Sequence, residues 1–486
     1  MSESGTAAVR TVRRPVPTVG ALDAYVALAG RFGPAQVCLL ESAGGPADDC
    51  RHNVLGFGEL LAVSVTRGEV LVTGPDELRE LVLAATAPWL ECAFGVQRLR
   101  TNRTLWDLLR AVESVFDAER SATSFEFGFF GFFGYDTAHY IEELPFLVRR
   151  GQQVPDVHLV LYQGVLREDL ATGRSELLVH QSARWPDLDV DEVAALLGTA
   201  GTPPAPGEQD VTGTDDDVER EAYLSHVDKA LQHIAIGDIY QVQIGHELTL
   251  HSEATPLEVY QRLRARNASP YMCLAPVREH TVVGASPELF VRLVDGEVVM
   301  RPIAGTIPRG VLDDHAAGAK LRNDPKEIAE HVMLVDLCRN DIGRICARDT
   351  LGVRDEMVVE QYSHVLHLVS TVVGRIEPGT HAFDVIAAMF PAGTMTGAPK
   401  IRAMEIIEEV EAQRRGLYAG ALGLIGLGGY LNLSLCIRTL VHNDGAYRTR
   451  ASAGVVADSD ADREWTETLA KSSAAYWAVT GKELLP

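Results

Sequence analysis

Two glutamates three residues apart occur in the segment DPKEIAEHVMLVDLCRND (324–341) and could bind a hard cation. On a helix, Glu327 and Glu330 would share one face with His331. Carboxylates beside the apolar run 332–335 need a partner, because burying an unpaired charge is costly. Mg²⁺ prefers carboxylate oxygens and retains several waters. From spacing alone, a magnesium site and a solvated acidic face are equally supported.

A second pair with the same spacing, Glu464 and Glu467, lies in DADREWTETLAKSSAAYW (460–477), and Lys471 follows one helical turn after Glu467. The simplest interpretation is a surface ion pair between residues i and i+4, which contributes about 0.3–0.5 kcal/mol. Two such helices in one chain also favour a second interpretation, in which they face each other across a metal ion.

A glycine-rich turn precedes a predicted helix in FPAGTMTGAPKIRAMEII (390–407), where Thr394 and Thr396 lie between glycines and Pro399 opens the helix. Free N–H groups at such a helix start could bind a carboxylate, although simple helix capping explains the same pattern. The spacing does not match a Walker phosphate-binding loop.

Several polar residues lie in predicted strands, and each taken singly is more often a satisfied core or edge residue than a catalyst. They are Gln241, Glu288, His367, Tyr418 and Arg438.

The elements that must position these side chains alternate along the second half of the chain. Helices are predicted at 219–236, 256–265, 324–340, 382–389, 398–411 and 462–480, and strands at 239–250, 281–294, 297–303, 364–374, 418–426, 431–440 and 447–456. The strands come in hairpin-like groups, which predicts an α+β fold of large, mostly antiparallel β-sheets with helices outside. A Pro-, Gly- and Asp-rich stretch at 197–217 predicts a linker or loop between regions 1–196 and 218–486.

Composition limits the partners. With 44 basic and 67 acidic residues the net charge is −23, which argues against nucleic acid and anionic membranes as partners.

The uncharged stretch 417–437 is long enough to span a membrane, but its glycines favour two buried strands joined at Gly428-Gly429. Seven cysteines without a CxxC pair, and a start without a signal-peptide core, fit a cytoplasmic protein.

In combination these segments resemble the chorismate-utilising enzymes, a family that includes the anthranilate synthase large subunit and isochorismate synthase. The C-terminal resemblance rests on GASPELF, RPIAGTIPRG, DPKEIAEHVMLVDLCRNDIG, FPAGTMTGAPKIRAMEII and SAGVVADSDADREWTETLAKS, in this order. The N-terminal half resembles anthranilate synthase through CLLES, GFFGYDTAHYIE and NASPYM. The resemblance implies the fold of that subunit, a β-sandwich with helices outside, and Mg²⁺ and chorismate as ligands.

The resemblance also implies roles for matching residues. Glu330 and Glu467 would hold Mg²⁺, with Glu327 and Glu464 holding metal-bound waters. Glu288 would be the general acid that protonates the departing 4-hydroxyl. The other implied substrate-binding or catalytic residues are Arg438, Tyr418, Lys471, Gly454, Thr394, Gly305 and Thr306.

Two positions discriminate within the family. The resemblance implies that isochorismate and salicylate synthases activate water with a lysine base. This chain has Gln241 at the matching position. Aminodeoxychorismate synthases often have a lysine in the PIxGT motif, where this chain has Ala304. Both differences favour attack by ammonia on carbon 2, which gives 2-amino-2-deoxyisochorismate. A water-adding isomerase and a degenerate, non-catalytic paralogue are the alternatives.

The end product is less constrained. His367 occupies the position linked in the family to pyruvate elimination, so we expect anthranilate, with release of the aminated intermediate in a specialised pathway as the alternative. Ser42, Tyr271 and Met272 match the family's tryptophan site, but Ala268 and the segment RHNVLGFG (51–58) depart from it and argue against tryptophan inhibition. Asn432 also replaces a usual Asp. No glutaminase sequence is visible, so we expect a separate glutamine amidotransferase subunit, in a hetero-oligomer, or a homodimer.

Overall fold

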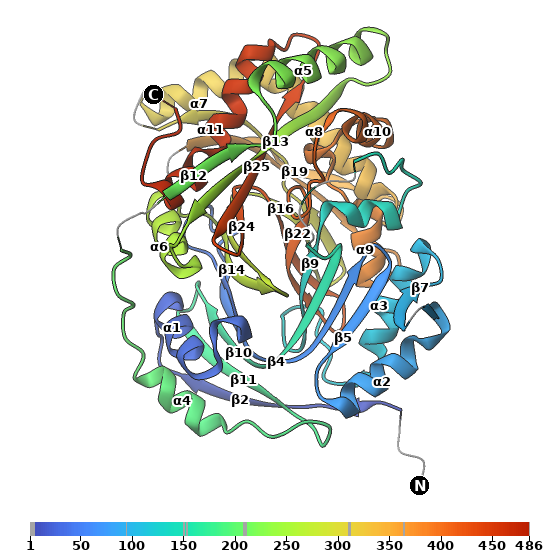
Figure 1. Cartoon of the computed structure of the whole chain (residues 1–486), viewed down its shortest axis with the longest axis vertical. Coiled ribbons are helices and arrows are strands. Elements are labelled where there is room, and N and C mark those ends of the chain that lie inside the picture. Colours follow the sequence, from blue (N-terminus) through green and yellow to red (C-terminus); the bar gives the residue numbers. More distant parts are fainter. Residues whose placement is uncertain are drawn as a thin grey trace.

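The computed structural model describes residues 5–485 except 94, 149–150, 152–153, 208–210, 310–312 and 363–364. Figure 1 shows strands through the centre of the molecule and helices around its outside. Within the described residues, the strand ladders are antiparallel, apart from the short parallel pair β1–β8. The α+β prediction is confirmed.

The helices cover the outer faces of the strands. They are α1 (Ala21–Phe32), α2 (Asp76–Thr86), α3 (Leu105–Ser114), α4 (Val190–Gly198), α5 (Arg220–Ala235), α6 (Pro256–Arg266), α7 (Asp314–Asn323), α8 (Pro325–Gly343), α9 (Ala382–Met389), α10 (Lys400–Val410) and α11 (Ala461–Thr480).

The strands of the N-terminal part are β1 (Ala7–Ala8), β2 (Arg10–Val16), β3 (Val37–Glu41), β4 (His52–Thr66), β5 (Glu69–Thr73), β6 (Leu90–Ala93), β7 (Val96–Leu99), β8 (Phe116–Asp117), β9 (Gly128–Phe133), β10 (Val157–Asp169) and β11 (Arg174–Gln181). Those of the C-terminal part are β12 (Val211–Asp216), β13 (Gln241–Ser252), β14 (Tyr271–Val277), β15 (His280–Ser286), β16 (Leu289–Val294), β17 (Glu297–Met300), β18 (Ile303–Pro308), β19 (Gly352–Gln361), β20 (Val365–Arg375), β21 (Gly397–Ala398), β22 (Ala421–Gly426), β23 (Tyr430–Leu435), β24 (Thr439–Asn443) and β25 (Ala446–Val455).

The core lies on both faces of the strands. On β10, Val160 and Tyr162 belong to a cluster built mainly from strand residues of both halves of the chain. Leu159 and Leu161, which alternate with them, belong to a different cluster that includes residues of the outer helices. Because successive strand residues point to opposite faces, this alternation creates an inner layer between sheets and outer layers under helices.

The two halves of the chain share their sheets. β14 pairs with β3, and β22 pairs with β9, so strands from before and after the predicted boundary lie side by side. The stretch 197–217 is not wholly a linker: its first residues end α4, and its last form β12, which pairs with β13. Pairing with β13 gives backbone hydrogen bonds to a segment whose polar composition predicts a loop.

Two local differences from the sequence prediction affect the site. The predicted strand 281–294 is two strands, β15 and β16, and Glu288 lies in the break between them. The uncharged stretch 417–437 forms the β22–β23 hairpin, where Gly428 and Gly429 turn with φ of 105° and 101°. In the described residues, no helix is long and apolar enough to cross a membrane.

Candidate active site

Helices α8 and α11 present the four predicted metal-binding glutamates to one another. Asp324 caps α8 and Asp460 caps α11, each through its carboxylate and free backbone N–H groups. Burial raises the pKa of Glu330, and the nearby charges of Glu327 and Glu467 raise it further. The charges of α8 and α11, although far apart in sequence, therefore lie within electrostatic reach of one another in the fold.

The other two glutamates share this field. Burial raises the pKa of Glu327 and of Glu464, and Glu467 adds to both increases. A Cβ on Gly305 would come 3.0 Å from a carboxylate oxygen of Glu327, so the glycine leaves space beside this carboxylate. In the described part of the chain, no three of these four carboxylates lie within 4.8 Å of one another. The helices gather the negative charge, but the carboxylates stand apart.

Lys471 and Tyr418 are connected to the wall of the site through Ser452. The Lys471 ammonium donates to the Ser452 carbonyl at 2.9 Å and pairs with Glu467 at 2.7 Å. The Tyr418 hydroxyl lies 2.6 Å from Ser452 Oγ, which donates to Gln243 Oε1 at 2.8 Å. Ser452 of β25 thus holds both Lys471, which lies on α11, and Tyr418, which lies in the segment before β22.

Arg438 provides an unpaired cation. Its guanidinium makes no hydrogen bond or ion pair to any residue in the described ranges, although the charges of Tyr418 and Glu467 act on it. Burial lowers its pKa below the usual arginine value. Its backbone φ of 51° is left-handed, a conformation that costs a non-glycine residue about 1–3 kcal/mol and occurs often at functional sites. A half-buried, unpaired arginine is suited to bind an anion.

Gln241 and Gly454 lie against each other on the paired strands β13 and β25. A Cβ on Gly454 would come 2.6 Å from Gln241 Nε2 and 2.9 Å from Gln243 Nε2, so a side chain there would have to displace these two amides. Gln241 is buried, and within the described residues its Oε1 has no hydrogen-bond partner. Because buried polar atoms are normally paired, this oxygen is available to a bound ligand.

Glu288 has the environment of a general acid. It lies in the break between β15 and β16 and is 9% exposed. Burial raises its pKa to about 8, and the Thr394 side chain and the Lys471 charge offset part of that increase. Thr394 and Arg301 line the same small pocket as Glu288. A carboxylic acid that stays protonated near neutral pH is suited to donate a proton.

His367 lies on β20 beside the strand that carries the PIAGT motif. Its Nδ1 bonds the carbonyl of Gly305 at 2.9 Å. Burial lowers the pKa of His367 to about 4, and Arg438 contributes to that decrease. The ring is therefore neutral at working pH. Ala304 of the PIAGT motif is buried on β18. The backbone of Thr306, on that strand, pairs with the backbone of His367 on β20. The Thr306 side chain lies outside the described residues.

Two residues that contact the predicted set are absent from the sequence prediction, namely Gln243 and Ser452. Gln243 is two residues from Gln241 and therefore on the same face of β13, and that alternation is the signal that could have identified it. Ser452 lies within the segment SAGVV, which carries part of the resemblance.

The predicted effector residues line a separate pocket between the two halves of the chain. Ser42, Tyr271 and Met272 all contribute to its walls, and so does Asn432. Asn432 Oδ1 is buried and has no hydrogen-bond partner in the described ranges. Glu41 is the acidic residue of this pocket. Its carboxylate already accepts hydrogen bonds from Tyr260 at 2.5 Å and from Arg264 at 2.8 Å.

Comparison with known proteins finds relatives along nearly the whole chain. The model of the chorismate binding enzyme family matches residues 69–476. A 2-amino-4-deoxychorismate synthase of Streptomyces globisporus is 61% identical over 98% of both chains. Anthranilate synthase component 1 of Acinetobacter calcoaceticus is 36% identical, over 91% of this chain and 90% of that one. The crystal structure of anthranilate synthase component I from Streptococcus pneumoniae superposes with a TM-score of 0.72 at 28% identity, covering 87% of this chain and 92% of that chain.

Proposed function

The chain belongs to the chorismate binding enzyme family, and from this premise we propose that it adds ammonia to carbon 2 of chorismate. The observation that carries the proposal is the 61% identity, over 98% of both chains, to a 2-amino-4-deoxychorismate synthase. That name describes nitrogen on carbon 2 and no hydroxyl on carbon 4, which is the same molecule as 2-amino-2-deoxyisochorismate. The synthase reaction predicted from Gln241 and Ala304 has this product.

The reaction replaces one substituent by another. Glu288 donates its proton to the 4-hydroxyl, which leaves as water while the ring double bonds shift and ammonia bonds to carbon 2. A hydroxide is a poor leaving group, so protonation supplies much of the barrier reduction. Arg438 and Lys471 bind the carboxylate of the enolpyruvyl group, with Tyr418 beside it, and this contact orients the substrate.

Magnesium is proposed as the cofactor because the donor set fits it. Glu330 and Glu467 would hold the ion, and Glu327 and Glu464 would hold its waters. Each of the three glutamates with a raised pKa would gain from a cation among them. When bound, Mg²⁺ would neutralise the ring carboxylate of chorismate and withdraw electrons from the ring.

Gln241 supports ammonia over water as the nucleophile. A carboxamide is no base at any working pH, so a water molecule beside it would not be activated. Ammonia is already nucleophilic and needs only to be positioned, and the unpaired Gln241 Oε1 is an acceptor for one of its N–H bonds. The test is to incubate the chain with chorismate and Mg²⁺ but without a nitrogen source. We expect no isochorismate, and its formation would overturn the proposal.

We propose that the aminated compound is released as the main product. Anthranilate is the second candidate. It is favoured by His367, whose neutral ring could accept a proton, and by the 36% identity to anthranilate synthase component 1. A pyruvate assay separates the two, because elimination releases one pyruvate for each anthranilate formed.

A separate glutamine amidotransferase is proposed as the ammonia source. The family model matches residues 69–476, and the nucleophile cysteine motif of a class I glutaminase is not visible in the sequence. Ammonium salts should therefore support the reaction of the isolated chain, whereas glutamine should not. Turnover of glutamine by the isolated chain would contradict this part of the proposal.

Replacement of a metal-binding glutamate should weaken the binding of magnesium. We expect Glu330→Gln to raise the free Mg²⁺ needed for half-maximal rate by at least about tenfold, because one of the ligands that bind the ion loses its charge. Measuring rate against free Mg²⁺ tests this. Asp336→Asn is the matched control, since Asp336 lies on the same helix but pairs with Arg339 on its exposed side. An equal shift in both variants would refute the assignment.

Tryptophan should leave the rate unchanged. An amino acid ligand brings an ammonium group, and in this pocket Asn432 is neutral while the Glu41 carboxylate is already bound by Tyr260 and Arg264. The measurement is the initial rate with and without millimolar L-tryptophan. Asn432→Asp restores a carboxylate and is expected to introduce some inhibition. Inhibition of the unmodified chain would show that the pocket recognises the ligand by other groups.

A further inference from the structure

A histidine outside the substrate site connects strand β13 to the helix that carries two of the predicted metal ligands. His246 Nε2 lies 2.8 Å from Thr468 Oγ1, and His246 Nδ1 lies 2.8 Å from a carboxylate oxygen of Asp216. Thr468 follows Glu467 directly and is one helical turn after Glu464. Both His246 and Thr468 are buried, at 1% and 0% exposure.

Both nitrogens of the His246 ring are engaged. The Asp216 carboxylate accepts the Nδ1 proton, and Nε2 shares a hydrogen bond with the Thr468 hydroxyl. Thr468 Oγ1 also lies 2.7 Å from the Trp465 carbonyl of its own helix. The ring stacks on the Trp465 ring, with 4.5 Å between the two ring centroids.

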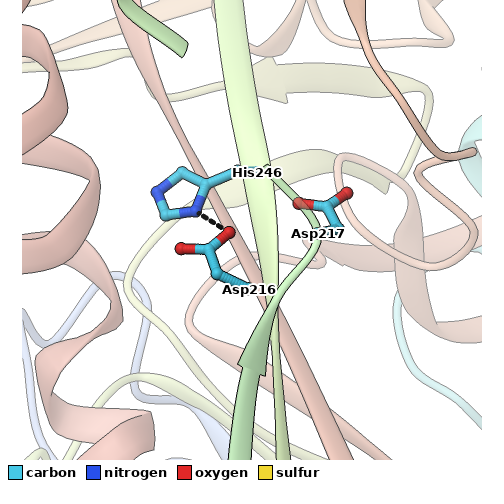
Figure 2. Close-up of side chains that lie close together, drawn as sticks. All are labelled: Asp216, Asp217 and His246. Atoms are coloured by element: carbon cyan, nitrogen blue, oxygen red, sulfur yellow. Dashed lines mark hydrogen bonds and ion pairs between the residues drawn. The ribbon is translucent and has the colours of Figure 1, made fainter. Parts of the chain in front are cut away.

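This group is not arranged as a metal site, although Asp216, Asp217 and His246 each place one potential ligand atom within 4.8 Å of the others. Figure 2 shows Asp216 beside the ring, whereas Asp217 extends on the other side of the strand in this view. Asp217 accepts the Glu247 backbone N–H at 2.6 Å and faces Arg450 at 3.9 Å. With both ring nitrogens engaged, His246 has no lone pair for a cation.

We infer that His246, oriented by Asp216, is a positioning residue that sets the rotation of α11 and thereby aims Glu464 and Glu467. Glu464, Thr468 and Lys471 share one face of α11, so a contact at Thr468 constrains the direction of the others. Another polar contact on this face, from Lys471 to the Ser452 carbonyl, uses a residue of the site itself. The His246–Thr468 contact is independent of ligands. This inference rests on the proposed role of the glutamates in holding magnesium.

A matched pair of substitutions isolates the contact. In His246→Asn the side-chain amide replaces Nδ1 and keeps the donor toward Asp216, but loses the hydrogen bond to Thr468. In His246→Gln the amide replaces Nε2 and keeps a hydrogen bond to Thr468. Both variants lose the ring and its stacking on Trp465, so a merely structural role predicts similar effects on both.

The readouts are the free Mg²⁺ at half-maximal rate and the increase in thermal midpoint caused by Mg²⁺ with chorismate. We expect His246→Asn to raise the half-saturating Mg²⁺ by about 10- to 100-fold and to shrink the Mg²⁺-induced increase in midpoint. His246→Gln should stay within about threefold of the unmodified chain, since it keeps the hydrogen bond that orients α11. Thr468→Val, which removes the hydroxyl that bonds His246, should behave as His246→Asn does, and Thr468→Ser as the unmodified chain.

Equal shifts in the two histidine variants, or none in either, would overturn the inference while leaving the proposed function intact. If a variant fails to fold, the Thr468 pair gives the same comparison with the ring in place. Absence of any Mg²⁺ dependence in the unmodified chain would instead overturn the proposed metal role, and the inference with it.

Discussion

Glu288→Gln should reduce ammonia-dependent turnover of chorismate by about a hundredfold to ten-thousandfold, the range in which a general acid contributes to catalysis. Glutamine has nearly the same shape, so the cavity with Thr394 and Arg301 should persist, while the proton for the departing hydroxyl is lost. The measurement is kcat and KM for chorismate with saturating ammonium. Because proton donation occurs in the transition state, we expect kcat to fall with little change in KM.

Glu59→Gln is the control for this substitution. Glu59 is also a carboxylate whose pKa is raised by burial, but it lies on β4 in the other half of the chain. Its replacement should leave turnover unchanged. Loss of activity in Glu59→Gln, or retention of activity in Glu288→Gln, would contradict the assignment.

The pH dependence follows from the same group. The protonated form of Glu288 is the active one, and its pKa is raised to about 8. The value of kcat/KM for chorismate should therefore hold below that pH and fall about tenfold per pH unit above it, once corrected for the fraction of free ammonia. His367, with its pKa lowered to about 4, should give no acidic limb between pH 5 and 7. The residual activity of Glu288→Gln should lack the alkaline limb.

Arg438→Met should lower kcat/KM for chorismate by about 10- to 150-fold, which corresponds to loss of one charged hydrogen bond of about 1.5–3 kcal/mol. The arginine has no partner among the described residues, so its removal leaves no protein group unpaired. The effect should therefore appear in substrate binding and little in stability. Steady-state kinetics together with the thermal midpoint separate these contributions.

Arg354→Met controls for the general loss of positive charge from an acidic protein. Arg354 pairs with Glu297 on the surface and is 53% exposed. Its loss should change kcat/KM less than about twofold, because exposed ion pairs are screened by solvent. A similar decrease in both variants would attribute the effect to long-range charge instead of a direct contact with the substrate.

Much of this site follows from local sequence signals. The spacing of Glu327 and Glu330, and of Glu464 and Glu467, predicts one face on each of two helices, and α8 and α11 form where expected. The glycine pair 428–429 likewise predicts the hairpin turn. These features depend on helical period and on turn chemistry, which neighbouring residues determine.

Other features depend on distant parts of the chain. The strand predicted at 281–294 breaks at Glu288, because β15 pairs with β24 while β16 pairs with β23. The polar stretch around 211–216 becomes a strand only because the edge of β13 is available to it. The contact from His246 to Thr468 joins residues 222 positions apart, and no local pattern marks it. Such contacts are set by the packing of whole elements.

The most direct measurement is the structure of the product formed from chorismate, Mg²⁺ and ¹⁵N-labelled ammonium by the isolated chain. The account predicts a single main product with ¹⁵N bonded to carbon 2, the enolpyruvyl group retained and no equivalent of pyruvate, as seen by NMR and mass spectrometry. Labelled anthranilate with pyruvate would keep the amination but contradict release of the intermediate. Nitrogen on carbon 4, or an unlabelled isochorismate, would contradict the central claim.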